Sequence, residues 1–486
     1  MNNFIYTFKV RSVFYFVLAV IFLKLLVIGF VPLVDDEMYY VVFSNHLDFG
    51  YIDHGPIISL IIWLFTVLSE HAFFVRIGSV LMFCLILVTC YQFCKQYFNV
   101  RVGRIIVIFL ATSFAFHINA VIMTPDVPVA FFTIFAIIYY YKSYFISQKY
   151  FYIAGLFLGL ALLSKISALF PALGIFLYPI IDKRARKSLK NKNYYLSFII
   201  AFLILLPFII WNIYNDFAFI RYQFGHVNKD SASISSFIEI WGATALLMGP
   251  FFFYYSIFLP IKYLFKLDEV NSSYIFFSAV SIVPTMYFFV QSIFSELLLN
   301  WPAPIFYSTI FLFCIHIDKN WQSEKLKFRF QIVYSFLLIL FITVQTFSPI
   351  LLLKGKSDPT NRFYKYSSFS KSLKGIVVSK PEFLDLRIVS NNFQIPSAIN
   401  YYLKPDIESI CLSIKYHKTI FSFLYPDEDL IGKDFLYVHR GKKFSDKVIP
   451  YFDSIELVDT ITSYRDRIPV NIFSVWHVKN YNIINN

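Results

Sequence analysis

The feature that most limits how this chain can fold is a series of long apolar segments between residues 12 and 353. A helix needs about 20 apolar residues to cross the hydrocarbon core of a bilayer. Eleven segments reach or approach that length, and the two within 151–181 are short. They cover residues 12–33, 73–94, 104–122, 126–146, 151–164, 166–181, 194–214, 237–261, 273–294, 302–317 and 330–353. The sequence therefore predicts a polytopic α-helical membrane protein with about 11 transmembrane helices.

The scarcity of charge supports this prediction. Only 15% of the residues are charged and 58% are hydrophobic, with a mean hydropathy of +0.62. A soluble protein carries about 25% charged residues, so this chain has too few charges to cover an aqueous surface. The apolar stretch 57–69 is only 13 residues long, which is typical of a helix that lies in the membrane interface.

The charged connections between the apolar segments predict the orientation. Connections rich in Lys and Arg, such as residues 182–193, alternate with a second set that begins with the acidic connection 35–56. The first acidic connection, residues 35–56, holds five acidic residues and neither Lys nor Arg. Because basic connections stay in the cytoplasm, we expect a multi-pass protein of the inner (plasma) membrane with a cytoplasmic N-terminus. The net charge of +13 then reflects orientation and does not indicate a nucleic-acid partner.

The chain changes character after residue 353. Residues 354–486 are rich in charges and turns and lack an apolar run long enough to cross a bilayer. Runs of β-branched and aromatic residues are typical of strands: GIVVS at 375–379, RIVSNN at 387–392 and DFLYVH at 434–439. We therefore expect a transmembrane domain of residues 1–353 and a soluble α/β domain of residues 354–486. An odd number of spans places the second domain in the periplasm.

The first outer loop, residues 35–72, carries the most candidate chemistry. Asp35, Asp36 and Glu37 follow the first span directly. Acidic residues favour the N-termini of helices, so a solvated helix start is one interpretation. The alternative is a carboxylate held at the membrane boundary as a general base or metal ligand.

The same loop contains a second polar group. Asp53 and His54 precede Gly55-Pro56, where we expect a sharp turn that brings an acid–imidazole pair back toward the first acids. Tyrosines of the loop supply hydroxyl groups and flat faces on which a sugar can stack: Tyr39, Tyr40 and Tyr51.

Further polar residues lie near the ends of later spans. Asp126 begins the fourth span, where it is interpreted either as an acid of the catalytic site or as a helix cap. Lys165 separates two apolar segments. It is interpreted either as a cation with a function in the site or as a lysine whose side chain extends to the membrane interface. Arg221 and His226 follow the seventh span. Trp301 lies in a rigid turn before the tenth span, where it either contacts a sugar or anchors the helix at the interface.

The absence of three known motifs narrows the range of possible functions. The sequence has no Walker motif, which leaves ATP-driven transport unsupported, and neither a Gly-x-Ser-x-Gly nor a His-Glu-x-x-His motif. Nucleotide sugars are normally used on the cytoplasmic face, so acids on the outer face favour a donor carried by the membrane. A lipid or solute transporter or flippase is the alternative, with Asp126 and Lys165 along its path. It predicts inverted repeats and polar residues at mid-membrane on several helices, and neither is evident.

Taken together, several short motifs resemble a known family. They are Asp36-Glu37, YIDHGP at 51–56, TPDVP at 124–128, LGLALLSK at 158–165, NWPAP at 300–304 and the segment Val389–Pro405. The set is similar to bacterial integral-membrane glycosyltransferases of the GT-C fold. These are relatives of the dolichyl-phosphate-mannose protein mannosyltransferases and include the lipid A aminoarabinose transferases. The resemblance implies a polyprenyl (undecaprenyl) phosphate-sugar donor in the bilayer and a membrane lipid, glycan or protein as acceptor.

By position, the resemblance also implies residue roles. Asp36 matches the catalytic carboxylate, Glu37 orients it, and Asp126 matches a second acid of the catalytic site. The resemblance implies that Asp53 and His54 match an acid–base pair of the first outer loop and that Lys165 contacts the donor phosphate. Arg221, a cation that no motif covers, is a further candidate for binding the donor and its phosphate. Stacking on the substrate is assigned to Tyr39, Tyr40 and Trp301.

The sequence departs from the family pattern in two places. The usual Asp-His-Pro-Pro is Asp53-His54-Gly55-Pro56, which predicts a more flexible loop. The aminoarabinose transferases carry an Arg three residues after the catalytic Asp, where this chain has Tyr39, which puts aminoarabinose as the sugar in doubt. It also leaves His54, Lys165 and Arg221 to balance the phosphate.

The sequence does not decide whether the reaction needs a metal. Transfer from a lipid phosphate requires positive charge where the phosphate leaves, from Lys, Arg or a divalent ion. The candidates for holding such an ion are Asp36, Asp53, His54 and Asp126, and their spacing is not diagnostic.

Overall fold

The computed structural model describes residues 10–227, 233–414 and 418–483. The chain divides into two compact units. The first comprises Met1–Ile28, His54–Ile58 and Arg76–Phe341, and the second comprises Gly29–Asp53, Ser59–Val75 and Ile342–Asn486. Most of the first outer loop thus belongs to the same unit as the C-terminal segment.

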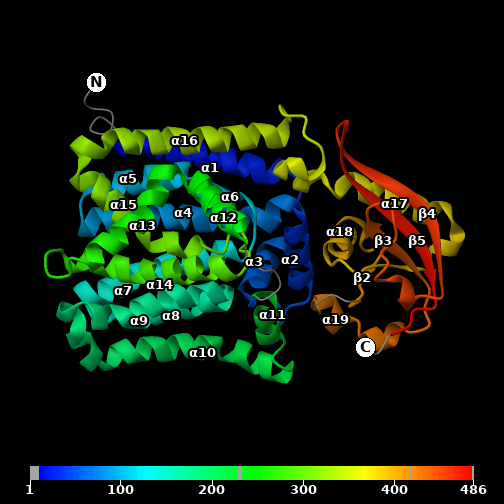
Figure 1. The fold of residues 1–486 in the computed structure, drawn as a ribbon, viewed down its shortest axis with the longest axis horizontal. Helices are drawn as coiled ribbons and strands as arrows, with labels where there is room; N and C mark the ends of the chain where they lie inside the picture. The colour runs from blue at the N-terminus through cyan, green and yellow to red at the C-terminus, as the bar shows by residue number, and fades with distance from the viewer. Residues whose placement is uncertain (1–9, 228–232, 415–417, 484–486) are drawn as a thin grey trace. The chain divides into compact units, whose positions relative to one another are not determined.

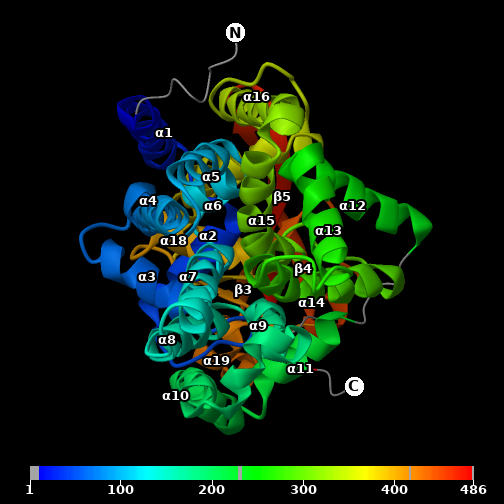
Figure 2. The ribbon, with the colours of Figure 1, turned by 90° about the vertical axis from the view of Figure 1, so that its left-hand side faces the viewer.

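The first unit is helical (Figure 1). Some of its α-helices continue into the second unit along the chain. The helices are α1 (Val10–Phe30), α4 (Ala72–Tyr97), α5 (Val100–Thr112), α6 (Phe114–Val121), α7 (Asp126–Phe145), α8 (Tyr150–Ser164), α9 (Leu169–Ile181), α10 (Lys192–Tyr214), α11 (Ala218–Val227), α12 (Ile234–Met248), α13 (Pro250–Leu264), α14 (Ser272–Phe294), α15 (Phe306–Lys319) and α16 (Trp321–Phe347). Short 3-10 helices are η1 (Ile166–Ala168), η2 (Lys183–Lys190) and η3 (Ala303–Ile305). Figure 2 shows α5 and α16 nearly end on, as members of a bundle.

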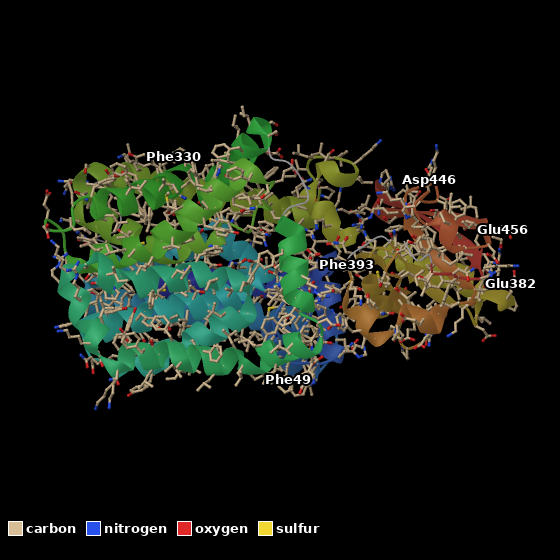
Figure 3. The ribbon with its side chains drawn as sticks, turned by 60° about the horizontal axis from the view of Figure 1, so that its bottom comes forward. Phe49, Phe330, Glu382, Phe393, Asp446 and Glu456 are labelled. Carbon is tan, nitrogen blue, oxygen red and sulfur yellow. The ribbon has the colours of Figure 1, made fainter. Side chains whose placement is uncertain are left out.

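The helices have the length and composition of a multi-pass membrane protein. Within the described residues, six helices are long and apolar enough to cross a bilayer: α1, α4, α7, α10, α14 and α16. Three bent helix pairs pass the same test together, which raises the number to as many as nine. Apolar side chains on these helices are exposed, as for Phe330 of α16 with 52% exposure (Figure 3). The number of 11 spans stays a prediction.

Two predicted spans are broken: 104–122, where α5 and α6 meet at 63°, and 237–261. The segment 237–261 was expected as a single helix, but α12 and α13 meet at 109°. The bend falls at Gly249, whose φ of +86° favours glycine. The side chain of Gln331 replaces the lost helical bonds, since it accepts from the Phe252 N–H at 3.1 Å and donates to the Met248 carbonyl at 2.9 Å. Backbone groups at membrane depth need such internal partners.

Close helix packing brings α8 against α10. Gly155 and Gly159 lie one turn apart on α8, and a Cβ at Gly155 would come 2.2 Å from the Ser197 carbonyl oxygen of α10. At Gly159 a Cβ would meet the Ile204 side chain at 2.8 Å and the backbone of Ala201 at 3.0 Å. Small residues four apart allow this approach of two backbones, and they fix the end of α8 from which Lys165 follows.

The second unit contains a five-stranded sheet in the order β2-β1-β3-β5-β4. Its strands are β1 (Arg387–Ser390), β2 (Ser409–Cys411), β3 (Phe435–Arg440), β4 (Ser454–Arg465) and β5 (Ile468–Lys479). β1 pairs in parallel with β2 and β3, whereas β5 is antiparallel to β3 and β4. Register pairs include Val389 with Tyr437 and Tyr437 with Trp476. The predicted C-terminal α/β character is confirmed.

Helices and short 3-10 turns complete this unit. Its α-helices are α2 (Asp35–Asn45), α3 (Ile57–Thr66), which begins in the first unit, α17 (Ser367–Ser379), α18 (Gln394–Leu403) and α19 (Ile420–Leu424). The 3-10 helices are η4 (Gly355–Ser357), η5 (Pro359–Tyr364), η6 (Pro381–Phe383), η7 (Asp427–Leu430) and η8 (Ile449–Tyr451). Glu382 and Glu456, labelled in Figure 3, are exposed side chains of this unit.

The strand predicted at GIVVS is wrong, because these residues end α17. The side chains of Phe369, Leu373 and Val377 are buried at a spacing of four residues. That spacing is helical, so burial of one helix face overrides the β-branched composition. The strands predicted at 387–392 and 434–439 are present as β1 and β3.

Candidate active site

Acidic residues form the first turn of α2 in the second unit. The helix begins at Asp35, and the carboxylate of Glu37 accepts a hydrogen bond from the Val34 N–H at 3.0 Å. Glu37 therefore satisfies one of the backbone donors left open at a helix start. The helix-start interpretation of the acidic triplet describes Glu37, whereas Asp35 and Asp36 make other contacts.

Arg362, at the end of η5, binds both of those aspartates. Its Nη2 lies 2.6 Å from Oδ1 of Asp35 and 2.8 Å from Oδ2 of Asp36, and its Nε donates to Asp35 at 3.2 Å. Lys365 donates to the other oxygen of Asp35 at 3.1 Å. The side chain of Asp35 is 3% exposed, but that of Asp36 is 37% exposed. Asp36 is therefore the member of the pair that a substrate can reach.

Gln394 holds the second oxygen of Asp36. Its side-chain amide donates to Oδ1 of Asp36 at 3.2 Å, and its own oxygen accepts from Nη2 of Arg440 at 3.1 Å. Gln394 begins α18, and this helix packs against α2. Arg440 also donates to the hydroxyl of Tyr366 at 3.1 Å. The first-loop acids thus lie in a continuous polar network, which we term the α2 acid cluster: Asp35, Asp36, Arg362, Lys365, Gln394 and Arg440.

The two aspartates have pKa values displaced in opposite directions. Burial alone would raise the pKa of Asp35, but the charges and hydrogen bonds of Arg362 and Lys365 outweigh it and leave the pKa below its ordinary value. Burial, followed by the negative charge of Asp35, raises the pKa of Asp36 above its ordinary value, although Arg362 and Gln394 oppose the shift. The cluster therefore pairs a permanent carboxylate with a more basic one, which suits Asp36 for proton transfer.

The tyrosines of α2 lie inside the second unit. The side chains of Tyr39 and Tyr40 are 3% and 8% exposed. The Tyr39 ring lies 4.3 Å from that of Phe393, which is labelled in Figure 3, and 4.6 Å from that of Phe43. The Tyr51 ring stacks on Phe43 at 4.0 Å. These rings pack the loop against its surroundings and leave little surface for a sugar.

A second polar cluster lies in the first unit, and we term it the Asp126 cluster. Oδ1 of Asp126, the first residue of α7, lies 2.7 Å from the ammonium group of Lys165. Its other oxygen accepts from the side-chain amide of Asn300 at 2.7 Å. Lys165 follows the last turn of α8 in an extended conformation. The predicted placement of Lys165 between two helical segments is thus confirmed, and its charge is paired.

His54 belongs to the same unit and interacts electrostatically with Lys165 and Asp126. Burial, aided by the positive charge of Lys165, lowers the pKa of His54 to about 3, although Asp126 opposes the shift. The imidazole is therefore neutral at physiological pH, so it can supply hydrogen bonds but not the positive charge expected from the sequence. That charge is left to Lys165 within this cluster.

Gly55 has a steric role that corrects the expected loop flexibility. A Cβ at Gly55 would lie 1.8 Å from the Leu163 carbonyl oxygen of α8. No side chain fits there, so glycine is required by a close approach of two backbone segments. This contact holds His54 beside the end of α8.

The remaining predicted residues are placed as follows. Asp53 is a buried residue of the second unit, and Arg221 is an exposed residue of α11 in the first unit. The side chain of His226 lies outside the described residues. Trp301 packs against the hydrophobic core of the first unit, which agrees with an anchoring role.

The predicted metal candidates are divided between the two units, with Asp36 and Asp53 in the second and His54 and Asp126 in the first. Among the described residues, no group of three or more His, Cys, Asp or Glu side chains is placed to hold a metal ion. Within the clusters, Asp36 is ion-paired with Arg362, and Asp126 is ion-paired with Lys165. The oxygens of Asp36 and Asp126 thus already face protein cations.

Sequence reasoning missed several site residues. Arg362 and Lys365 lie in a charged stretch that carries no motif, and their partners lie more than 320 residues earlier. Asn300 and Gln394 both lie in segments that resemble the family, so the motifs contained a signal that was not assigned to them. Tyr307, 3% exposed and near Asp126, carries no sequence signal of its own.

Part of the chain matches the model of a known protein family. Residues 53–211 match a family model described as dolichyl-phosphate-mannose-protein mannosyltransferase. No curated protein sequence matches the chain.

Solved structures show the same fold. ArnT from Cupriavidus metallidurans bound to undecaprenyl phosphate is similar with a TM-score of 0.66 and 13% identity, over 96% of this chain and 98% of that one. Its apo state gives a TM-score of 0.64 and 13% identity, over 96% and 97% of the two chains. The archaeal oligosaccharyltransferase AglB from Archaeoglobus fulgidus, in complex with an inhibitory peptide and a dolichol-phosphate, gives 0.50 and 12% identity, over 82% of this chain and 64% of that one. The fold implied by the resemblance to GT-C membrane glycosyltransferases is therefore confirmed, and none of these comparisons supports the transporter alternative.

Proposed function

We propose that this chain is an integral-membrane glycosyltransferase that moves a sugar from a polyprenyl-phosphate donor to a hydroxyl-bearing acceptor of the cell envelope. The acceptor is a lipid A-type glycolipid, another glycan or a protein. Transfer takes place on the non-cytoplasmic face of the inner membrane, with the N-terminus in the cytoplasm. The shared fold with a structure that holds undecaprenyl phosphate supports the class of donor.

The observation that carries this proposal is the state of Asp36. It is the half-exposed carboxylate of the first outer loop, both of its oxygens accept hydrogen bonds, and burial raises its pKa. A general base works best when its pKa approaches the working pH, and such a base contributes about 10²–10⁴-fold in rate. Asp36 takes the proton of the acceptor hydroxyl as that oxygen forms a bond to the anomeric carbon.

The phosphate leaving group requires a positive charge nearby. As the new bond forms, the bond from the anomeric carbon to the phosphate oxygen breaks, and the electron pair leaves with polyprenyl phosphate. We assign the stabilisation of this phosphate to Lys165, because fixed positive charge at a developing anion is an effective form of catalysis. Asp126 and Asn300 orient Lys165 through the contacts described above. Displacement in one step inverts the configuration at the anomeric carbon.

Positive charge from side chains makes a metal unnecessary in this scheme. Two of the three carboxylates that were candidates for metal binding, Asp36 and Asp126, are already paired with Arg362 and Lys165. A divalent ion would need to displace these cations, so the donor set does not fit one well, and no step is assigned to it.

Mass spectrometry of envelope lipids and glycans tests the proposal. Cells that lack the protein should lose one sugar mass from a single class of envelope molecule, and the wild-type gene should restore it. Asp36→Asn, produced at the same level in membranes, should restore less than about one hundredth of the product. Full restoration by Asp36→Asn would rule out the mechanism, and unchanged envelope molecules in the deletion strain would rule out the function.

A further inference from the structure

The C-terminal segment supplies every side chain outside α2 that contacts Asp35 and Asp36 within the α2 acid cluster. Arg362, Lys365 and Gln394 all follow the last predicted span, and all belong to the same compact unit as α2. The sequence predicted only that this segment forms a separate soluble α/β domain. Its contacts with the first-loop carboxylates indicate a closer connection with the chemistry.

Each oxygen of Asp36 has its own donor. Oδ2 accepts from Nη2 of Arg362 at 2.8 Å, and Oδ1 accepts from Gln394 at 3.2 Å. A carboxylate held through one oxygen can still swing about its Cβ–Cγ bond, whereas one held through both keeps its plane. Because a carboxylate oxygen has two lone pairs, these contacts leave an acceptor position on each oxygen open.

Arg362 is itself held in place. Its guanidinium makes two hydrogen bonds to Asp35 besides the one to Asp36, and Asp35 is fixed by Lys365 as well. The charges within this group of four side chains balance, with two carboxylates and two cations. Without Arg362, neighbouring carboxylates on the same helix turn would repel each other, and one oxygen of Asp36 would lose its donor.

We propose that Arg362, assisted by Gln394, is a positioning residue that holds the carboxylate of Asp36 in the orientation required for proton removal from the acceptor. This inference rests on the proposed function of Asp36. It makes the C-terminal segment a functional part of the catalytic site. Lysine is a poor replacement for Arg362, since one ammonium group lacks the planar fork that spans two carboxylates.

The test uses purified full-length protein in detergent. Initial rates of product formation are measured against increasing amounts of a lipid extract from cells that lack the protein, because this extract retains the unused donor. Product is followed by the mass difference found in the envelope comparison. Arg362→Gln should lower the maximal rate by about tenfold to a hundredfold. The amount of extract that gives half of the maximal rate should stay within about twofold, since a positioning residue does not bind the donor.

Three further variants sharpen the result. Arg362→Lys should recover only part of the lost rate. Gln394→Ala should lower the maximal rate several-fold without a change of charge, and it carries the test if Arg362→Gln loses its cooperative thermal transition. Lys374→Gln is the matched control, since Lys374 pairs with Asp406 on the exposed surface of the same unit. It should behave as the wild type.

Different outcomes would contradict the inference about Arg362 and the proposed function on which it rests. A wild-type maximal rate in both Arg362→Gln and Gln394→Ala would overturn the inference. So would a loss seen only as a larger half-saturating amount of extract, which would make Arg362 a donor-binding residue. Full activity of Asp36→Asn would instead overturn the base role of Asp36 on which the inference rests, and unchanged envelope molecules in the deletion strain would overturn the proposed function.

Discussion

The ammonium group of Lys165 lies 2.7 Å from Oδ1 of Asp126, although 39 residues separate them in the chain. Both side chains are almost enclosed, with 13% and 12% exposure. An isolated charge at such a site is costly, and the pair offsets part of this cost. The pairing also keeps Lys165 oriented in the absence of a phosphate, so the cation is preorganised for an anionic ligand.

Lys165→Met should weaken the binding of undecaprenyl phosphate to the purified protein. A hydrogen bond to a charged group contributes about 1.5–3 kcal/mol, so we expect roughly tenfold to a hundredfold weaker binding. Tryptophan fluorescence or calorimetry with undecaprenyl phosphate in detergent measures the change. Lys266→Gln is the matched control, because Lys266 pairs with Glu269 on the exposed surface of the same unit. Unchanged affinity in Lys165→Met would contradict the assigned role.

Chelation of divalent ions should leave the transfer rate unchanged. The oxygens of Asp36 and Asp126 already face Arg362 and Lys165, respectively, so positive charge in each cluster comes from side chains. The measurement compares initial rates of purified protein before and after dialysis against EDTA, and again after addition of Mg²⁺ or Mn²⁺. We expect all rates to agree within about twofold. A loss on chelation that the added metal reverses would show that an ion completes the site.

Gly55→Ala should destabilise the first unit. The new Cβ would overlap the Leu163 carbonyl oxygen at 1.8 Å, and forced overpacking typically costs about 1–3 kcal/mol. Thermal unfolding in detergent should show a lower midpoint, and donor binding should weaken because His54 and Lys165 flank the strained contact. Gly242→Ala is the control, since a Cβ there meets no atom within 4 Å. Equal midpoints for the two variants would contradict the steric argument.

The parts of the fold that depend on local patterns were predictable from the sequence. Apolar length located the helices, and β-branched runs located β1 and β3. The bend at Gly249 was not predicted, since hydropathy does not register a positive φ whose broken bonds are completed by Gln331 from α16. The strand predicted at 375–379 failed because helical burial of α17 overrides composition.

The candidate site was predictable only for the residues that carry motifs. Asp36, Asp126 and Lys165 were recognised because their neighbours in the sequence resemble a family. Arg362 and Gln394 lie 326 and 358 residues from Asp36, and only the folded chain brings them to it. The neutral state of His54 was not predictable either, because it depends on burial beside Lys165.

A buried ion pair in the second unit predicts a defined loss of stability in acid. Arg465 and Asp358 are 1% and 3% exposed, with Nη1 and Oδ2 3.3 Å apart. Burial alone would raise the pKa of Asp358, but hydrogen bonds from Gln345 and Thr360 and the charge of Arg465 lower it below its ordinary value of 3.8. A carboxyl group whose folded pKa is depressed contributes stability above its ordinary pKa, and the contribution disappears as the pH falls through the folded pKa.

The thermal midpoint of the wild type should therefore be nearly constant from about pH 7 to pH 5 and fall below about pH 4. Asp358→Asn should lower the midpoint at pH 7, because an unpaired Arg465 stays buried at a cost on the order of 3 kcal/mol. The variant should also lose less stability on acidification, since it lacks the titrating group. Asp406→Asn removes an exposed partner of Lys374 and should follow the wild-type curve. A wild-type midpoint for Asp358→Asn at pH 7 would contradict the argument that the pair stabilises the unit.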